Sequence, residues 1–194
     1  IAIRKGLKSV GFDSFNSPTD TSAFGGGITC QETDEFIALD DKIATDYVSV
    51  ECWWTRDSAG SGEDIVWNKE GTWEIRDDGG NINWAVKANN RGWFWYDSTA
   101  NISVGETVHF VLTYDGNYVK SYKNGELVQT YTYPSGGVLT SQTSCYPKLN
   151  SRGCTRTSVQ NPGNHTFYQF RIYDRALTDE EIGHNYSATS LKFI

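Results

Sequence analysis

Two hairpin turns in quick succession constrain the fold of this chain more than any other feature. The turn dipeptides are Asp115-Gly116 and Asn124-Gly125, and the runs around them are rich in Val, Tyr and Thr. Two-residue hairpin loops require positive φ at their central residues, which Asn, Asp and Gly tolerate best. We therefore predict three consecutive antiparallel strands, a β-meander, over Thr107–Tyr131.

The same alternation of short strands and turns continues over most of the chain. Residues Tyr47–Trp54 place Val48, Val50 and Cys52 on one strand face. Further strands are expected over Val10–Phe15, Asp64–Lys69, Trp73–Arg76, Ile82–Lys87, Trp93–Tyr96 and Phe167–Tyr173. One helix is expected from Thr178, which with Glu181 forms a capping box, to about Tyr186. Many short strands and one short helix predict an all-β sandwich of two antiparallel sheets.

Length and charge exclude several classes of protein. With 194 residues the chain fits one domain, which we divide into a polar, turn-rich leading segment (1–24) and the sandwich (25–194). The net charge is −7, and an acidic chain lacks the positive surface of a nucleic-acid binder. No apolar run approaches the ~18 residues that a membrane span needs. We therefore expect no nucleic-acid partner and no membrane insertion.

The four cysteines allow two disulfides in three pairings. Cys145 and Cys154 bracket a short polar loop, and we expect them to pair. Cys30 and Cys52 each lie in a strand-like run, where they either pair across neighbouring strands or remain buried thiols. A disulfide of either kind would indicate an oxidising compartment.

Three segments, in the same order along the chain, resemble laminin-G-like domains of the concanavalin A-like lectin/glucanase superfamily. Residues 107–127 resemble that family's "W-H-H-V-A-x-T-Y-D-G … L-Y-V-N-G" segment, and Phe170–Ile182 resembles its "V-R-I-Y-N-R-A-L-S-x-x-E-I" ending. Upstream, Glu35–Leu39 and the run Val48–Trp54 resemble "D-Y-I-x-L … I-S-x-x-W-V". The resemblance covers roughly residues 35–190 and implies a jelly-roll sandwich of two curved antiparallel sheets.

The C-terminal segment has a narrower resemblance. Glu181–Phe193 is similar to the ending "E-I-x-x-N-Y-N-A-x-x-x-R-F" of laminin-G-like domains in tailed-phage structural proteins. This resemblance implies a virion structural protein. Because the chain begins with Ile1 and contains no Met, we expect a processed product or a segment of a longer protein. The expected location is extracellular or on a virion surface.

The resemblance also implies where calcium would bind, and the chain departs from it there. Many relatives carry acidic residues just before the "V-R-I-Y" strand, whereas this chain has Tyr168 and Gln169. Calcium prefers ~6–8 oxygen ligands, mostly carboxylates and carbonyls. The other candidate carboxylates form no motif: Asp13, Asp34, Asp40 and Asp41. We expect no cofactor, with calcium as the alternative.

We expect no enzymatic activity. Glucanases of this superfamily carry three carboxylates on one strand face, in the pattern E-x-D-x-x-E or E-x-D-x-E, to supply the acid and the nucleophile. The nearest string, Glu32-Thr33-Asp34-Glu35, lacks the final glutamate in phase. His109 and His165 have no nucleophilic serine or cysteine in a recognisable elbow, so we interpret His109 as a packed or surface histidine.

Exposed aromatic residues are the remaining candidates for function, because sugars stack their apolar faces on aromatic rings. Aromatic residues at strand period usually fill a core, but tryptophan is rarely fully buried, and the chain contains seven. At least one exposed aromatic patch is therefore expected. The candidate ligand-binding residues are Trp73, Arg91, Trp93, Trp95, Asp97, Tyr118 and Tyr146.

Two functions follow from these observations. The first is a non-catalytic carbohydrate-binding or adhesion module whose partners are glycans or glycoprotein surfaces. The alternative is a structural domain (decoration, fibre or assembly) of a virion or cell-surface particle that does not bind glycans. Its partners would be other copies of the chain or neighbouring virion or cell-surface proteins.

Overall fold

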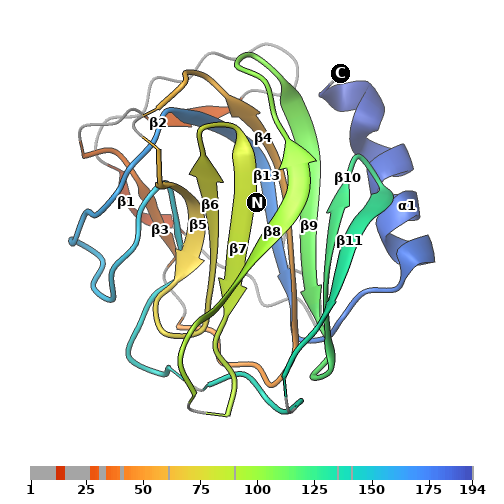
Figure 1. Ribbon diagram of the computed structural model, residues 1–194. Helices are drawn as coiled ribbons and strands as arrows, with labels where there is room; N and C mark the ends of the chain where they lie inside the picture. The colour runs from red at the N-terminus through yellow and green to blue at the C-terminus, as the bar shows by residue number, and fades with distance from the viewer. Residues whose placement is uncertain are drawn as a thin grey trace.

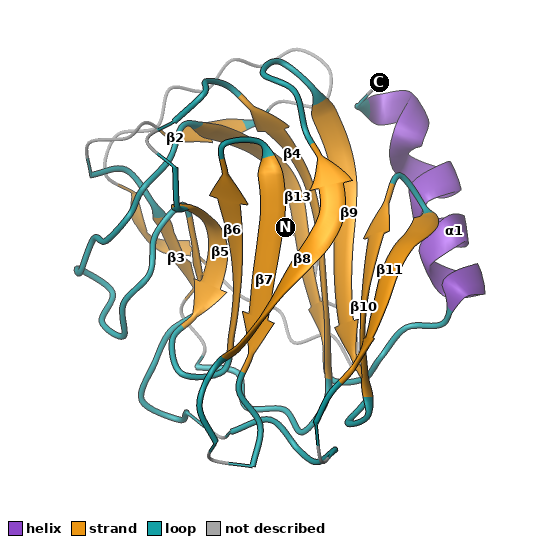
Figure 2. Cartoon of the chain, viewed as in Figure 1, coloured by secondary structure: helices purple, strands orange, loops and turns teal. Residues whose placement is uncertain are grey.

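A computed structural model describes residues 12–15 (backbone only), 27–30, 34–39, 42–60, 62–89, 91–134, 136–140 and 142–193. Within these residues two antiparallel sheets face each other as a jelly-roll sandwich, with a helix beside one of them (Figures 1 and 2). The seven-stranded sheet has the order β1 (Phe12–Phe15), β3 (Ile37–Leu39), β12 (Lys148–Leu149), β5 (Asp64–Lys69), β6 (Trp73–Asp78), β7 (Asn81–Val86) and β8 (Phe94–Asn101). The six-stranded sheet has the order β11 (Glu126–Thr132), β10 (Tyr118–Lys123), β9 (Thr107–Tyr114), β4 (Val48–Arg56), β13 (His165–Tyr173) and β2 (Ile28–Cys30).

The predicted meander is confirmed as β9, β10 and β11. Asn124 and Gly125 form the second turn with φ of 53° and 83°, in the left-handed region that a two-residue hairpin requires. In the first turn Gly116 has a φ of 99°, and the Asp115 carboxylate accepts the backbone N–H groups of Asn117 and Tyr118 at 2.8 and 2.7 Å. The sequence thus determines this part of the fold locally.

The core lies between the two sheets and consists of the side chains that point inward from their strands. Trp67 on β5 lies between Phe110 on β9 and Phe170 on β13, with ring centroids 6.1 Å away in both cases. Trp54 and Trp84 are also completely buried in this core. Aromatic rings of this size bury large apolar areas, which is how a chain with modest aliphatic content fills a sandwich.

The C-terminal helix α1 (Asp179–Thr189) packs on the outer face of the six-stranded sheet and is followed by the short 3-10 turn η1 (Ser190–Lys192). The predicted capping box is present: Thr178 accepts the backbone N–H of Glu181, and the Glu181 carboxylate accepts that of Thr178. The helix continues to Thr189, beyond the predicted end at Tyr186. Within the described residues, no helix has the length and apolarity needed to cross a membrane.

The strand predicted around Val10–Phe15 is present as β1, which pairs with β3. The rest of the leading segment 1–24 lies outside the described residues, so the division between this segment and the sandwich stays a prediction.

The expected disulfide between Cys145 and Cys154 is present, whereas Cys30 and Cys52 are free and buried. Of the two alternatives for Cys30 and Cys52, the buried thiols are confirmed and the disulfide is wrong, because β13 lies between their strands. Cys30 lies opposite His165 and Cys52 opposite Phe170, so the two thiols occupy separate positions in the sheet.

The disulfide closes a loop of about ten residues. The resulting loss of entropy in the unfolded chain stabilises the folded state by about 2.7 kcal/mol. We expect the double variant Cys145→Ser/Cys154→Ser to lose up to about this much free energy of unfolding in urea titrations. Reduction of the wild-type protein should give a similar loss and should leave the double variant unaffected. An unchanged urea midpoint in both experiments would show that the loop is held by its other contacts.

Candidate functional site

The outer surface of β6, β7 and β8 presents polar and aromatic side chains to solvent. We call Arg76, Asn83, Trp93, Trp95 and Asp97 the aromatic face. Arg76 lies opposite Asn83, and Asn83 lies opposite Asp97, so these three residues form one row across the sheet. Since successive strand residues point to opposite faces, and the intervening Ile82, Trp84 and Tyr96 contact the core, this row points outward.

Trp93 and Trp95 lie side by side at this surface. Their ring centroids are 6.3 Å apart with an interplanar angle of 33°, and Trp95 is 43 % exposed. The intervening Phe94 packs against the core. Because the strand alternates, the run Trp-Phe-Trp-Tyr sends two rings outward and two inward. The result is a pair of neighbouring indoles on a rigid sheet.

The charged groups around Trp95 are already paired with one another. The Arg76 guanidinium lies 4.4 Å from the centroid of the Trp95 ring, in cation–π distance. Its nitrogens also reach the carboxylates of Glu63 at 3.1 Å and Asp78 at 4.0 Å. Asn83 donates to Asp78 at 3.1 Å. These contacts fix the surroundings of Trp95 before any ligand binds.

Asp97 is held in a local turn of β8. One of its carboxylate oxygens accepts the backbone N–H of Thr99 at 2.7 Å, and Thr99 has a φ of 56°. Asp97 is exposed, so its carboxylate faces solvent beside Asn83 and can accept hydrogen bonds from a ligand.

The disulfide loop borders the aromatic face. Glu74 on β6 lies opposite Ala85, and Ala85 lies opposite Trp95, so the three form a second row across the sheet. Arg152, from the loop that Cys145–Cys154 closes, forms an ion pair with Glu74, which also accepts from Asn68 at 2.8 Å. Burial raises the pKa of Glu74. The loop thus covers the side of the sheet that adjoins Trp95.

Of the other predicted binding residues, Trp73 is corrected by the structure. It is 1 % exposed because it faces inward from β6, and it belongs to the core. Arg91 is exposed in the turn that precedes Trp93, where its backbone N–H donates to Ala88. Tyr118 is 46 % exposed but lies on β10 of the six-stranded sheet. Tyr146, in the disulfide loop, has the charged groups of Lys42 and Arg156 over its ring, 5.0 and 4.5 Å from the centroid.

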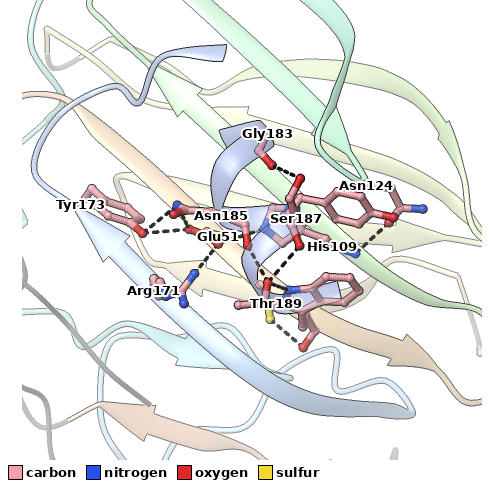
Figure 3. A network of polar contacts seen from close by, with 12 residues as sticks. Glu51, His109, Asn124, Arg171, Tyr173, Gly183, Asn185, Ser187 and Thr189 are labelled. Atoms are coloured by element: carbon pink, nitrogen blue, oxygen red, sulfur yellow. Dashed lines mark hydrogen bonds and ion pairs between the residues drawn. The ribbon is translucent and has the colours of Figure 1, made fainter. Parts of the chain in front are cut away.

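A buried polar cluster that the sequence analysis did not predict lies under α1 (Figure 3). The Glu51 carboxylate accepts hydrogen bonds from His109 at 2.9 Å, Arg171 at 2.6 Å, Tyr173 at 2.9 Å and Asn185 at 3.0 Å. Burial raises the pKa of Glu51, but the hydrogen bond and charge of His109 and the charge of Arg171 outweigh burial, so this pKa lies below its usual value.

This cluster fastens the helix to the sheet. Next to it, Trp53 stacks on Tyr186 of α1 at 5.7 Å and donates from its indole to Thr189 at 2.9 Å. Glu51 and His109 are 1 % and 0 % exposed, so neither reaches solvent. Of the two interpretations of His109, as a packed or a surface histidine, the packed one is confirmed, and we interpret the cluster as a structural joint.

Among the described residues, no group of three or more His, Cys, Asp or Glu side chains is arranged to hold a metal ion. The calcium alternative stays a prediction. Tyr168, at one of the positions where relatives have acidic residues, shares a hydrogen bond with Thr55 at 3.0 Å. Asp34 is exposed in a turn, and the side chains of Asp13, Asp40 and Asp41 lie outside the described residues.

Jelly-roll sandwiches of two antiparallel sheets occur in lectin domains, viral capsid proteins and cupins. The sequence profile of the laminin-G-like family described as "Concanavalin A-like lectin/glucanases superfamily" matches residues 31–183. The chain therefore belongs to this family, as its three sequence blocks predict. No curated protein sequence matches the chain significantly.

Several solved structures share the fold. The receptor binding domain of botulinum neurotoxin C/D mosaic serotype has a TM-score of 0.70 and 16 % identity, covering 94 % of this chain and 47 % of its own. The binding domain of Paraclostridial Mosquitocidal Protein 1 has a TM-score of 0.70 and 14 % identity, covering 92 % and 47 %. The botulinum neurotoxin serotype D ligand binding domain in complex with N-acetylneuraminic acid has a TM-score of 0.69 and 16 % identity, covering 94 % and 47 %. The chain thus spans about half the length of these domains and shares their fold.

Proposed function

We propose that the chain is a non-catalytic carbohydrate-binding module that recognises glycans through its aromatic face. The observation that carries this proposal is the pair of neighbouring indoles, Trp93 and Trp95, at the surface of a rigid sheet. Exposed aromatic side chains on an otherwise polar surface mark contact sites. A structural neighbour that binds N-acetylneuraminic acid, and family membership in a lectin superfamily, support the same class of ligand.

The chemistry of the aromatic face suits sugar binding. The exposed part of the Trp95 indole, next to Trp93, offers apolar surface for the C–H groups of a pyranose ring, and Asn83 and Asp97 offer polar groups for its hydroxyls. Since the side chains around Trp95 are held by their own contacts, little conformational entropy is lost on binding. The close Glu51–His109 pair is buried and Asp78 is engaged by Arg76 and Asn83, so the geometry supports binding rather than hydrolysis.

A module of this kind acts outside the cell, and the Cys145–Cys154 disulfide supports an oxidising location. The alternative is a structural domain of a virion or cell-surface assembly. It is supported by the resemblance of the C-terminal segment Glu181–Phe193 to tailed-phage structural proteins.

A glycan array probed with the disulfide-intact protein tests the proposal. We expect binding to a defined subset of glycans and no binding after the protein has been unfolded and reduced. Silence across a broad array would contradict the proposal. The oligomeric state, measured by light scattering, then decides about the alternative, because a structural domain is expected to self-associate whereas a free-standing lectin of this size can be monomeric.

A further inference from the structure

The charges nearest to Trp95 differ in how exposed they are. Glu63 and Asp78 have side chains that are 59 % and 47 % exposed, whereas the Arg76 side chain between them is only 17 % exposed. Asp97, in the same row as Arg76 and Asn83, is also exposed. A ligand that approaches Trp95 from solvent therefore meets three accessible carboxylates and one largely covered guanidinium.

The guanidinium of Arg76 is also occupied. Binding of a carboxylate by arginine depends on two parallel N–H donors aimed at its two oxygens. In Arg76 one terminal nitrogen faces Glu63 at 3.1 Å and the other faces Asp78 at 4.0 Å, while the central carbon lies over the Trp95 ring at 4.4 Å. An acidic sugar at Trp95 would have to displace one of these carboxylates and lie beside the others.

Two other cations, Lys87 and Arg91, lie toward the opposite end of β8. Lys87 and Arg91 flank the start of this strand, where Phe94 pairs with Val86. Asp78 lies near the far end, because its partner Asn81 also pairs with Asn101. Near Trp95 the cations Arg76 and Arg152 are only 17 % and 27 % exposed, and both are paired with carboxylates. The exposed charges around Trp95 and Asp97 are therefore mainly acidic, and the exposed Arg91 lies beyond Trp93.

We infer that, if the aromatic face binds glycans as proposed, it selects neutral oligosaccharides and rejects sialylated ones at Trp95. Carboxylates accept hydrogen bonds from uncharged hydroxyls, and amides both accept and donate them. A negatively charged sugar placed among these carboxylates is disfavoured. The pair of rings, 6.3 Å apart, further suits a ligand of at least two sugar units, one above each indole. This selectivity differs from that of the neighbour solved with N-acetylneuraminic acid.

The test compares a neutral oligosaccharide from the array with its α-sialylated derivative by titration calorimetry. We expect the sialylated form to bind at least about tenfold more weakly. The variant Glu63→Gln/Asp78→Asn removes two carboxylates and releases Arg76. It should therefore bind the sialylated form more tightly and reduce the ratio of the two dissociation constants, sialylated over neutral. The control Asp174→Asn/Glu180→Gln changes the net charge equally at exposed positions near α1 and should leave the ratio unchanged.

The outcomes separate this inference from the proposed function. If no glycan binds, or if Trp95→Ala binds all glycans like the wild type, the proposed site itself is wrong. If Trp95→Ala loses binding but the wild-type protein prefers the sialylated form, only the inference is overturned. An Arg91→Ala variant that then abolishes the preference would identify the cation responsible. An unchanged ratio in Glu63→Gln/Asp78→Asn would likewise contradict the role assigned to the two carboxylates.

Discussion

Replacing Trp95 by Ala is expected to weaken glycan binding about 30-fold. Truncation of a central aromatic anchor typically costs about 2 kcal/mol of binding free energy, and each 1.4 kcal/mol is tenfold. Trp95 has the exposure and position of such an anchor, since it is 43 % exposed and lies beside Trp93 and the Arg76 guanidinium. Titration calorimetry with the glycan selected by the array measures the loss directly.

Tyr118→Ala is the matched control for this variant. Tyr118 is exposed to a similar extent, 46 %, but it lies on β10 of the other sheet. We expect its replacement to leave the affinity unchanged. Both variants remove exposed side chains, so both should unfold within about 1 kcal/mol of the wild type. Full affinity in Trp95→Ala, or a large loss in Tyr118→Ala, would place the binding surface elsewhere.

Replacing Glu51 by Ala is expected to lower the free energy of unfolding by about 3 kcal/mol, because it leaves buried donors without their acceptor. The estimate is at the low end for buried pairs since the Arg171 side chain is 17 % exposed and partly solvated. Urea unfolding followed by far-UV circular dichroism measures the loss. Glu180→Ala, an exposed carboxylate of α1, should change stability by only about 0.5 kcal/mol. Equal effects of the two variants would show that the cluster does not fasten the helix.

The same cluster predicts a pH dependence. The pKa of folded Glu51 lies below its ordinary value of 4.5, so its contribution to stability is fully present above pH 4.5 and disappears as the pH falls through the folded pKa. Glu51→Gln cannot titrate at this position. The part of the stability difference between wild type and Glu51→Gln that comes from the ionised carboxylate should therefore shrink as the pH falls below 4.5. A difference that grows on acidification would contradict the lowered pKa.

The strands and turns of this fold are predictable because their signals are local. Asp115-Gly116, Asn124-Gly125 and the capping box at Thr178 fix backbone geometry through their own side chains and φ angles. The family resemblance supplied the jelly-roll arrangement, which periodicity alone does not specify.

The burial of the tryptophans could not be predicted from local sequence patterns. Trp73 and Trp95 both lie in strands, yet Trp73 is in the core and Trp95 faces solvent. The run Trp93–Tyr96 is aromatic at every position, so it has no polar–apolar contrast to indicate which face is outside. Only the strand pairing indicates which face is outside. Ala85 lies opposite Trp95 on the outer face, and the inward Trp84 stacks on Tyr96 at 4.5 Å.

The cluster around Glu51 was unpredictable for a different reason. Its members come from β4, β9, β13 and α1, which are distant in sequence and meet only once the sheet and the helix are assembled. One signal was present: Glu51 and Trp53 alternate with core residues and therefore face away from the core, where a large ring needs a covering element. The helix α1 provides that cover.

The indole N–H signals of the seven tryptophans test the central claim most directly. Five of them, Trp53, Trp54, Trp67, Trp73 and Trp84, are at most 1 % exposed. In a ¹H–¹⁵N titration with the neutral oligosaccharide selected by the array, we expect the signals of Trp93 and Trp95 to shift and saturate together while those five stay in place. Saturable binding that leaves the Trp93 and Trp95 signals unmoved would contradict glycan recognition by the aromatic face.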